Sequence, residues 1–281
     1  MPNWLFDLSS TQVLLLFIAV FVGGTCLGTV TVQPLLRRWI APQPDWNALV
    51  TGVLSCFVVF YGLLLGLLAV AAHERRTSVE NIVSREALSL AGIYGEVNVI
   101  YPDDLRHELH ELLRQYVDAT IREDWPQQQR GELPWAGTRI MQKINARLWS
   151  FDPPDQRAQI VHAELLDQLS VPRDLRRERL YAIHSGLPNL LWYVVWIGAV
   201  LTIVFIYLFD LQRRNALLLA GLLSFFIAFL TGVIAVLDRP LLGPRAVAPQ
   251  SFEMLRTEVM SRPTARNADA QGKPTSNSQS P

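Results

Sequence analysis

Four long apolar stretches without a charged residue constrain this chain more than any other feature of its sequence. They cover residues 11–32, 47–72, 187–209 and 216–237, and none of them contains Asp, Glu, Lys, Arg or His. A helix needs about 20 apolar residues to cross the hydrocarbon core of a bilayer, and all four stretches are long enough. We therefore expect four transmembrane helices, because charge-free runs of this length are rare in soluble cores.

The residues before the first stretch argue against a cleaved signal peptide. They read MPNWLFDLSS and carry one Asp and no Lys or Arg, whereas a signal peptide begins with a basic region and has a shorter apolar core. We therefore expect the first stretch to remain as a membrane helix.

The segment between the second and third stretches, residues 73–186, is polar and has the pattern of a helical insert. Apolar residues recur three and four positions apart along residues 79–97, as on one face of a helix. No proline separates this pattern from the second stretch, so we expect one helix to continue out of the membrane. Another helix is expected to begin near Pro102, with further helices within residues 138–187. Three tryptophans of the insert, Trp125, Trp135 and Trp149, are expected to pack in its core.

These patterns predict an all-α integral membrane protein with four transmembrane helices and a helical soluble insert between helices two and three. We divide the chain into transmembrane helices 1 and 2 at residues 11–72, the insert at 73–186, and a transmembrane hairpin at 187–237. A post-helix motif at 238–256 and a disordered tail at 257–281 complete it, because the end of the chain is rich in polar residues, Pro and Gly.

The sequence contains no phosphate-binding loop, nucleophile elbow or zinc motif. The nearest approach to a metal site is His107 and His110 with the carboxylates around them, a pattern more typical of a solvated helix face. We therefore expect no enzyme activity, no cofactor, no metal and no nucleic-acid partner. A membrane enzyme that uses these two histidines stays open as a lesser hypothesis.

The second apolar stretch is the best candidate for a pore. Val53, Phe57, Tyr61 and Leu65 recur every fourth residue and are expected to share a helix face. Such a row is typical of helix packing, and it also suits an apolar constriction that gates by dewetting. No ionisable residue lies within a span, so the usual marker of proton relays is missing.

Arginines dominate the polar residues near the membrane ends. They contact lipid headgroups in one interpretation, and in the other they form a basic vestibule that concentrates anions. The arginines in question are Arg75, Arg76, Arg173, Arg176, Arg177, Arg179, Arg239 and Arg245.

Three quoted segments carry a family resemblance. They are GLLLGLLAVAAHERRTSVENIVSREALSLAGIY after the second span, LPNLLWYVVWIGA at the third, and LDRPLLGPRAVAPQSFEML after the fourth. In this order and spacing, residues 61–255 resemble the bestrophin-like domain family known as domain of unknown function 4239. That family is in turn distantly similar to bestrophins, which are pentameric anion channels with a helical cytosolic region between the second and third segments.

The resemblance implies a homo-oligomer in the lipid bilayer that passes small anions. It implies that Val53, Phe57 and Tyr61 line the pore, at the positions of the aromatic constriction of bestrophins. Bestrophins have a Pro–Phe–Gly motif and a calcium-binding acidic run after the fourth segment. This chain has Pro240-Leu241-Leu242-Gly243 without an acidic run, so calcium gating is not expected.

Asp238, Arg239, Pro240 and Gly243 form the post-helix motif. We interpret Asp238 and Arg239 as the exit of the fourth helix into the interface, where charge is tolerated. Pro240 ends the regular helix. Gly243 is then expected to help turn the chain, so that VAPQSFEML packs back on the insert. An ordinary helix end without a functional role is the alternative.

The orientation signals conflict. Arg37 and Arg38 follow the first span and favour an external insert, whereas Arg75, Arg76 and the basic residues 173–179 favour a cytoplasmic one. The resemblance favours a cytoplasmic insert, in a protein of the bacterial inner membrane. The leading functional hypothesis is thus an anion channel, and the alternative is a non-conducting membrane scaffold or sensor whose insert binds a partner.

Overall fold

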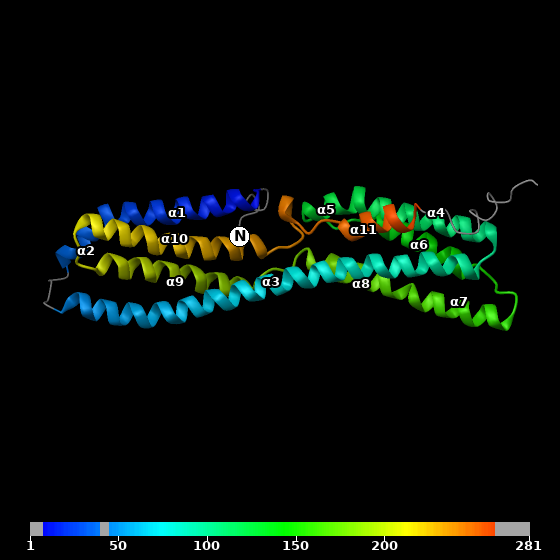
Figure 1. The fold of residues 1–281 in the computed structure, drawn as a ribbon, viewed down its shortest axis with the longest axis horizontal. Helices are drawn as coiled ribbons and strands as arrows, with labels where there is room; N and C mark the ends of the chain where they lie inside the picture. The colour runs from blue at the N-terminus through cyan, green and yellow to red at the C-terminus, as the bar shows by residue number, and fades with distance from the viewer. Residues whose placement is uncertain (1–7, 40–44, 262–281) are drawn as a thin grey trace, which may run out of the picture. The chain divides into compact units, whose positions relative to one another are not determined.

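The computed structural model describes residues 8–39 and 45–261, and within these ranges the chain forms helices and no strands (Figure 1). The helices are α1 Ser10–Thr31, α2 Gln33–Trp39, α3 Trp46–Ile100, α4 Asp103–Ala119, α5 Trp125–Gln129, α6 Ala136–Trp149, α7 Gln156–Gln168, α8 Ser170–Ala182, α9 Asn189–Leu208, α10 Arg213–Leu237 and α11 Gln250–Met254. Two π-helices, Thr120–Asp124 and Leu255–Val259, and a 3₁₀ turn at Gly243–Arg245 complete the described part.

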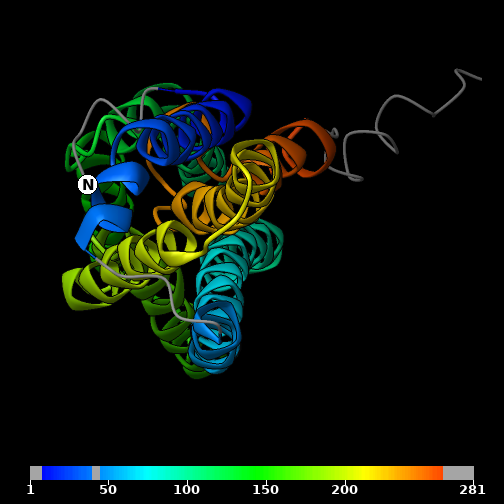
Figure 2. The same ribbon diagram turned by 90° about the vertical axis from the view of Figure 1, so that its left-hand side faces the viewer.

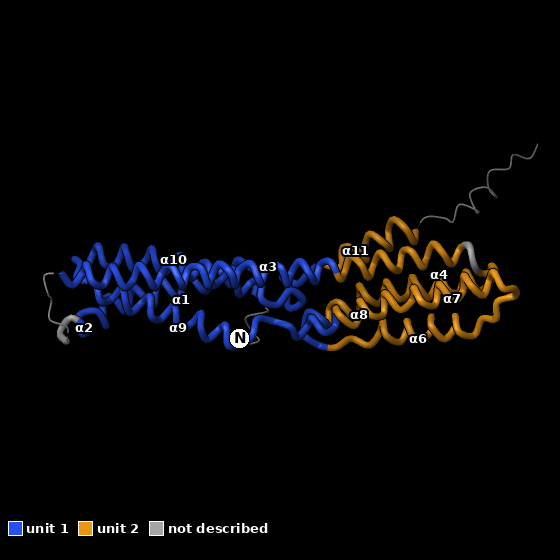
Figure 3. Tube along the Cα trace, turned by 90° about the horizontal axis from the view of Figure 1, so that it is seen from below, with its two compact units in different colours: residues 1–81, 128–132, 179–247 blue, residues 82–127, 133–178, 248–281 orange. Residues whose placement is uncertain are grey.

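The described chain forms two compact units, each of which is contributed by several segments (Figure 3). Unit 1 comprises residues 1–81, 128–132 and 179–247, and unit 2 comprises 82–127, 133–178 and 248–281.

Unit 1 contains the membrane helices. The helices α1, α3, α9 and α10 contain the four apolar windows that are long enough to span a bilayer, so the prediction of four spans is confirmed. The continuous helix predicted from the second span is confirmed as well, because α3 runs without interruption through Trp46–Ile100. No proline lies inside α3, so every residue retains the N–H that the helical ladder needs.

The four membrane helices share one apolar core. Leading members are Val13 and Phe17 of α1, Leu65 of α3, Val195 of α9 and Ile234 of α10, all buried. Seen from the membrane end, α1, α10 and α9 lie side by side and α3 runs along the edge of the group (Figure 2). Only 22% of the apolar window of α3 is buried inside the described structure, against 39% for α9 and α10. A large apolar surface of α3 is therefore left without a partner in the single chain.

Unit 2 is a bundle of amphipathic helices. The helix α4 begins after Pro102 and carries Asp103 and Asp104 in its first turn, where carboxylates offset the helix dipole. Its Leu105, Leu109, Leu113, Tyr116 and Val117 are buried at spacings of three and four, as the sequence pattern predicts.

Of the three tryptophans expected in the core of the insert, one is buried and two are exposed. Trp125 is buried and its ring meets Phe252 edge-on, with centroids 5.9 Å apart. Trp135 and Trp149 are exposed instead, because they lie at the start and at the end of α6 rather than on its buried face. The contact of Phe252 also confirms that the segment after the fourth span folds back on the insert.

The disordered tail predicted at 257–281 lies mostly outside the described residues. Residues 257–259 belong to the π-helix Leu255–Val259, so the tail prediction begins too early. Met260, which follows this π-helix, is buried in unit 2.

Candidate functional site

The three predicted pore residues lie on α3, but they do not share one surface. The side chain of Val53 is 49% exposed, Phe57 is half-buried and Tyr61 is 7% exposed. A step of four residues advances about 40° around an α-helix, because a turn holds 3.6 residues. Two such steps therefore rotate the row from the open surface of α3 toward the packed one.

Tyr61 is fixed against α9. Its hydroxyl donates a hydrogen bond of 2.8 Å to the backbone oxygen of Val195, and its ring fills the space beside Gly198, where an added Cβ would overlap it. Phe57 stacks on Tyr61 with ring centroids 5.9 Å apart and leans on Phe205 at 5.7 Å. An aromatic column thus joins α3 to α9.

The part of α3 that the single chain leaves exposed is apolar. Its most exposed side chains include Val59 and Phe60, each 68% exposed. Gly52, Gly62 and Gly66 lie on the same helix, and a Cβ added to any of them would meet nothing within 4 Å. Small residues allow close approach of another helix. The exposed surface of α3 therefore has both large side chains and glycine positions, against which another helix or lipid can pack.

The post-helix motif forms a compact turn at the end of α10. The carboxylate of Asp238 accepts a hydrogen bond from the backbone amide of Leu187 at 2.6 Å, which ties the end of α10 to the entry of α9. The backbone amide of Val247 donates to the oxygen of Pro240 at 2.7 Å and closes the loop between them. Gly243 has a φ of +68°, a conformation that L side chains disfavour.

Two arginines at the end of the second span, both on α3, hold the entry of α9 and the post-helix turn. Arg75 donates to the backbone oxygen of Gly186 at 2.5 Å. Arg76 donates to the backbone oxygen of Arg245 at 3.1 Å and pairs with Glu80 at 3.1 Å. Arg75 and Arg76, two of the arginines noted near the membrane, therefore have defined structural contacts in unit 1.

The two histidines considered for metal binding differ in their surroundings. His107 is exposed, whereas His110 is buried, stacks on Tyr94 at 4.0 Å between ring centroids and contacts the Tyr94 backbone oxygen through Nε2 at 3.1 Å. Burial lowers the pKa of His110, and the charges of Arg114, Arg106 and His107 lower it further against the bond to Tyr94. Within residues 8–39 and 45–261, no three His, Cys, Asp or Glu side chains are grouped to hold a metal.

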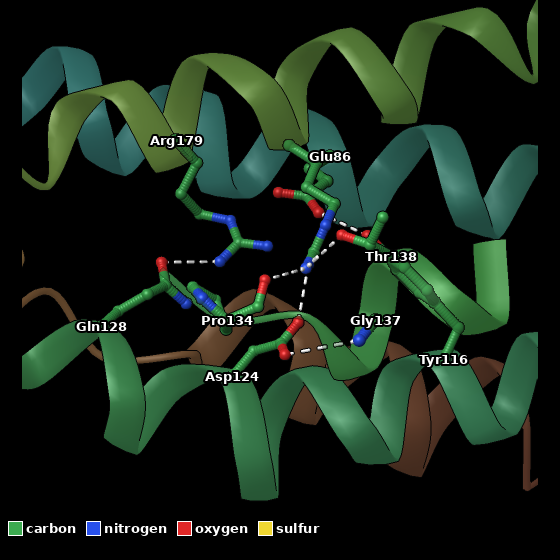
Figure 4. A network of polar contacts seen from close by, with 9 residues as sticks. Glu86, Tyr116, Asp124, Gln128, Pro134, Gly137, Thr138 and Arg179 are labelled. Carbon is green, nitrogen blue, oxygen red and sulfur yellow. Dashed lines mark hydrogen bonds and ion pairs between the residues drawn. The ribbon is translucent and has the colours of Figure 1, made fainter. Parts of the chain in front are cut away.

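The insert holds a buried ion pair that the sequence analysis missed. Arg176 of α8 and Asp124 of the π-helix Thr120–Asp124 are 2.7 Å apart, with side chains 5% and 0% exposed (Figure 4). Arg176 also donates to the Thr138 hydroxyl at 3.3 Å, and Asp124 accepts from the Gly137 amide at 3.3 Å. The partners are 52 residues apart, and no spacing pattern joins them in the sequence.

The charge of Arg176 is stabilised where it is buried. Burial alone lowers the pKa of its guanidinium, but Tyr116, Asp124 and Glu86 outweigh that effect, and the pKa lies above its ordinary value. The guanidinium also lies over the ring of Tyr116, 5.8 Å from its centroid. Arg176 therefore keeps its charge, and its contact with Asp124 holds α8 to the segment around the π-helix.

Comparisons with known proteins agree with this architecture. The chain is similar to a crystal structure of a bacterial bestrophin homologue from Klebsiella pneumoniae, with a TM-score of 0.63 and 12% identity over 88% of this chain and 98% of that one. For a substituted form of that homologue, the TM-score is 0.64 and the identity 12%, over 92% and 99% of the two chains. A crystal structure described as a membrane protein gives a TM-score of 0.64 at 11% identity, over 89% and 99%.

At these identities the likeness shows a shared fold. A search among curated proteins gives no significant match. Residues 19–252, which include all of α3, the insert, the hairpin and the post-helix motif up to Phe252, match the family described as the bestrophin-like domain. The chain is therefore a membrane protein of the bestrophin-like domain family.

Proposed function

We propose that this protein assembles as an oligomer and passes small anions along a path lined by α3. The observation that carries the proposal is the apolar surface of α3, most of which the single chain leaves unburied. Copies of α3 arranged around an axis would cover this surface and enclose a path. The similarity of the chain to crystal structures of bacterial bestrophin homologues supports the same function.

The lining of the path is proposed to include Val53 and Phe57. Phe57 belongs to the aromatic column, and Val53 lies one turn before it on α3 and is exposed. Tyr61 stays in the proposal as the residue that orients Phe57 through their stacked rings. The absence of charge within residues 47–72 of α3 makes such a constriction apolar, and an apolar constriction controls flux by wetting and dewetting.

Chloride efflux from liposomes that hold the purified full-length protein tests the proposal. Val53→Thr keeps the side-chain shape and adds a hydroxyl, so it is expected to ease wetting and raise efflux severalfold. Phe57→Ala is expected to widen the constriction and to raise efflux as well. The matched control is Val59→Thr, because Val59 is an equally branched residue on α3, about 120° from Val53 and exposed.

Efflux that responds to Val53→Thr but not to Val59→Thr supports a path at the Val53 side. The reverse pattern would move the path to another surface of α3 and remove Val53 from the lining. No efflux above that of empty liposomes, from folded and oligomeric protein, would overturn the channel proposal.

A non-conducting scaffold or sensor is the second candidate. It is favoured by exposed apolar side chains on the insert, among them Leu88 at 70%, Trp149 at 69% and Ile160 at 66%. A photo-crosslinking residue placed at Leu88 in cells tests it. Crosslinks to another protein, together with no flux in liposomes, would favour the scaffold over the channel.

We place the protein in the bacterial inner membrane with the insert in the cytoplasm. The basic residues beside the second and third spans support this orientation. Ser150 is exposed on the insert, so Ser150→Cys provides a label site in a background with Cys26 and Cys56 replaced. An impermeant maleimide is expected to label it only after the cells are permeabilised, and labelling in intact cells would reverse the orientation.

A further inference from the structure

Four arginines of unit 1 gather at the end of the membrane spans where α10 stops and α9 begins. We call Arg75, Arg76, Arg239 and Arg245 the arginine collar. Arg75 and Arg76 follow the charge-free part of α3, which ends at Ala72. Arg239 and Arg245 belong to the post-helix turn, which the bond between Val247 and Pro240 closes.

Two contacts bring the arginines together. The Arg75 guanidinium donates to the Gly186 backbone oxygen, and the side chain of Arg239 lies against the same glycine, with Nε 3.3 Å from the position of an added Cβ. The Arg76 guanidinium donates to the backbone oxygen of Arg245. Arg76 thus bonds directly to Arg245, and Arg75 and Arg239 contact the same residue, Gly186.

Arg75 and Arg76 have N–H donors that their bonds within the chain do not use. A guanidinium carries five N–H groups, and Arg75 uses one of them in its bond to Gly186. Arg76 uses two in its bonds to Glu80 and Arg245, and its side chain is 26% exposed. Arg75 is therefore held by Gly186 and Arg76 by the turn, and each guanidinium keeps N–H groups that these bonds do not use.

The electrostatics favour an anion at the same place. The carboxylate of Asp238 lies among these residues and is engaged by the Leu187 amide, and Glu80 pairs with Arg76. Burial lowers the pKa of the Arg245 guanidinium. An added anion would oppose this effect, since a nearby negative charge favours the charged form of a guanidinium.

We propose that the arginine collar binds the phosphate group of an anionic ligand at the end of the membrane spans. Guanidinium groups suit phosphate because their N–H donors match its oxygens in pairs. The position next to the apolar windows suits the headgroup of an anionic phospholipid, and a free phosphate has the same chemistry. The proposal goes beyond anion conduction and does not depend on it.

Thermal unfolding of the purified full-length protein in an uncharged detergent tests the site, with tryptophan fluorescence as the signal. The probes are phosphatidylglycerol, phosphatidylcholine and inorganic phosphate, each titrated at constant ionic strength. Phosphatidylglycerol or inorganic phosphate is expected to raise the Tm of the wild type, and phosphatidylcholine is not. A response to phosphatidylglycerol alone identifies a lipid site, and a response to both identifies a site for phosphate in general.

Arg75→Gln with Arg76→Gln removes two of the four cations. The apparent Kd is expected to rise about thirtyfold, since each basic side chain near an anionic headgroup contributes roughly 1 kcal/mol. The matched control is Arg213→Gln with Arg214→Gln, because these arginines are exposed at the other end of α10. The control is expected to keep the wild-type response.

Should the double variant not fold, Arg76→Gln alone decides the result, because its partly exposed side chain loses one ion pair and one carbonyl bond. A weaker response of this variant than of the control supports the site. An unchanged response of the collar variant, an equal response to phosphatidylcholine, or no response of the wild type would overturn the proposal.

Discussion

The buried pair of Asp124 and Arg176 gives the sharpest prediction about the insert. Asp124→Ala leaves the Arg176 guanidinium in a site where its side chain is 5% exposed, and it also removes the acceptor of the Gly137 amide. Breaking one side of a buried ion pair costs about 3–5 kcal/mol, and an unmatched buried amide adds about 1–3 kcal/mol. The expected loss of unfolding free energy is therefore about 4–8 kcal/mol.

The assay is thermal unfolding in detergent. For a chain of this size, each kcal/mol lowers Tm by about 2–4 °C, so a drop on the order of 10–30 °C is expected for Asp124→Ala. Glu132→Ala is the matched control, because the pair of Arg130 and Glu132 is 59% and 58% exposed and such a pair contributes under about 1 kcal/mol.

The double variant Asp124→Ala with Arg176→Met isolates the interaction. Removing both charges avoids an uncompensated buried cation, so the double variant is expected to be more stable than Asp124→Ala alone. A Tm of Asp124→Ala close to that of Glu132→Ala would refute the reasoning. So would a double variant whose loss of unfolding free energy equals the sum of the losses of Asp124→Ala and Arg176→Met measured singly, since the two residues would then act independently.

Three further changes test other contacts. Gly198→Ala is expected to lower Tm, because its Cβ would overlap the ring of Tyr61; Gly221→Ala, whose Cβ has no close neighbour, is the control. Asp238→Ala is expected to cost about 1–3 kcal/mol of unfolding free energy, because it leaves a buried amide without its acceptor, and Asp238→Asn should recover part of the Tm. Burial holds the pKa of His110 below 6.5, so its neutral form stabilises the fold above about pH 6.5 and this contribution is lost as the pH falls further. His110→Gln should therefore lose less Tm on acidification than the wild type, and equal losses would contradict this.

The membrane architecture was predictable from the sequence because lipid imposes a strict composition. A spanning helix must satisfy its own backbone and avoid charge, so the four apolar windows located α1, α9, α10 and the start of α3 within a few residues. The unbroken helix α3 followed from the same reasoning, since no proline interrupts residues 46–100.

The surface of α3 was harder to predict than its bounds. A four-residue repeat placed Val53, Phe57 and Tyr61 on one face, but the drift of about 40° at each step separates them. Which side of the row is covered depends on where α9 packs, and in the structure Tyr61 meets Val195 and Gly198. Pairwise packing of this kind leaves no trace in the periodicity of one helix.

The polar contacts between distant segments were also hidden. Arg176 was visible as one of several arginines near the third span, and Asp124 as one of several carboxylates in the insert. Their pairing depends on the π-helix Thr120–Asp124, which changes the direction of the side chains at the end of α4. Arg75 and Asp238 likewise act through backbone groups of residues 186 and 187, and every residue carries such groups.

The reversal potential of the purified protein in a planar bilayer with unequal chloride concentrations tests the proposed function most directly. An anion path along α3 predicts a current that reverses near the chloride equilibrium potential and a conductance that changes in Val53→Thr. The reversal is expected to hold without added calcium, because no acidic run follows Gly243. A current that reverses near the cation potential, or no current from folded oligomers, would contradict an anion channel.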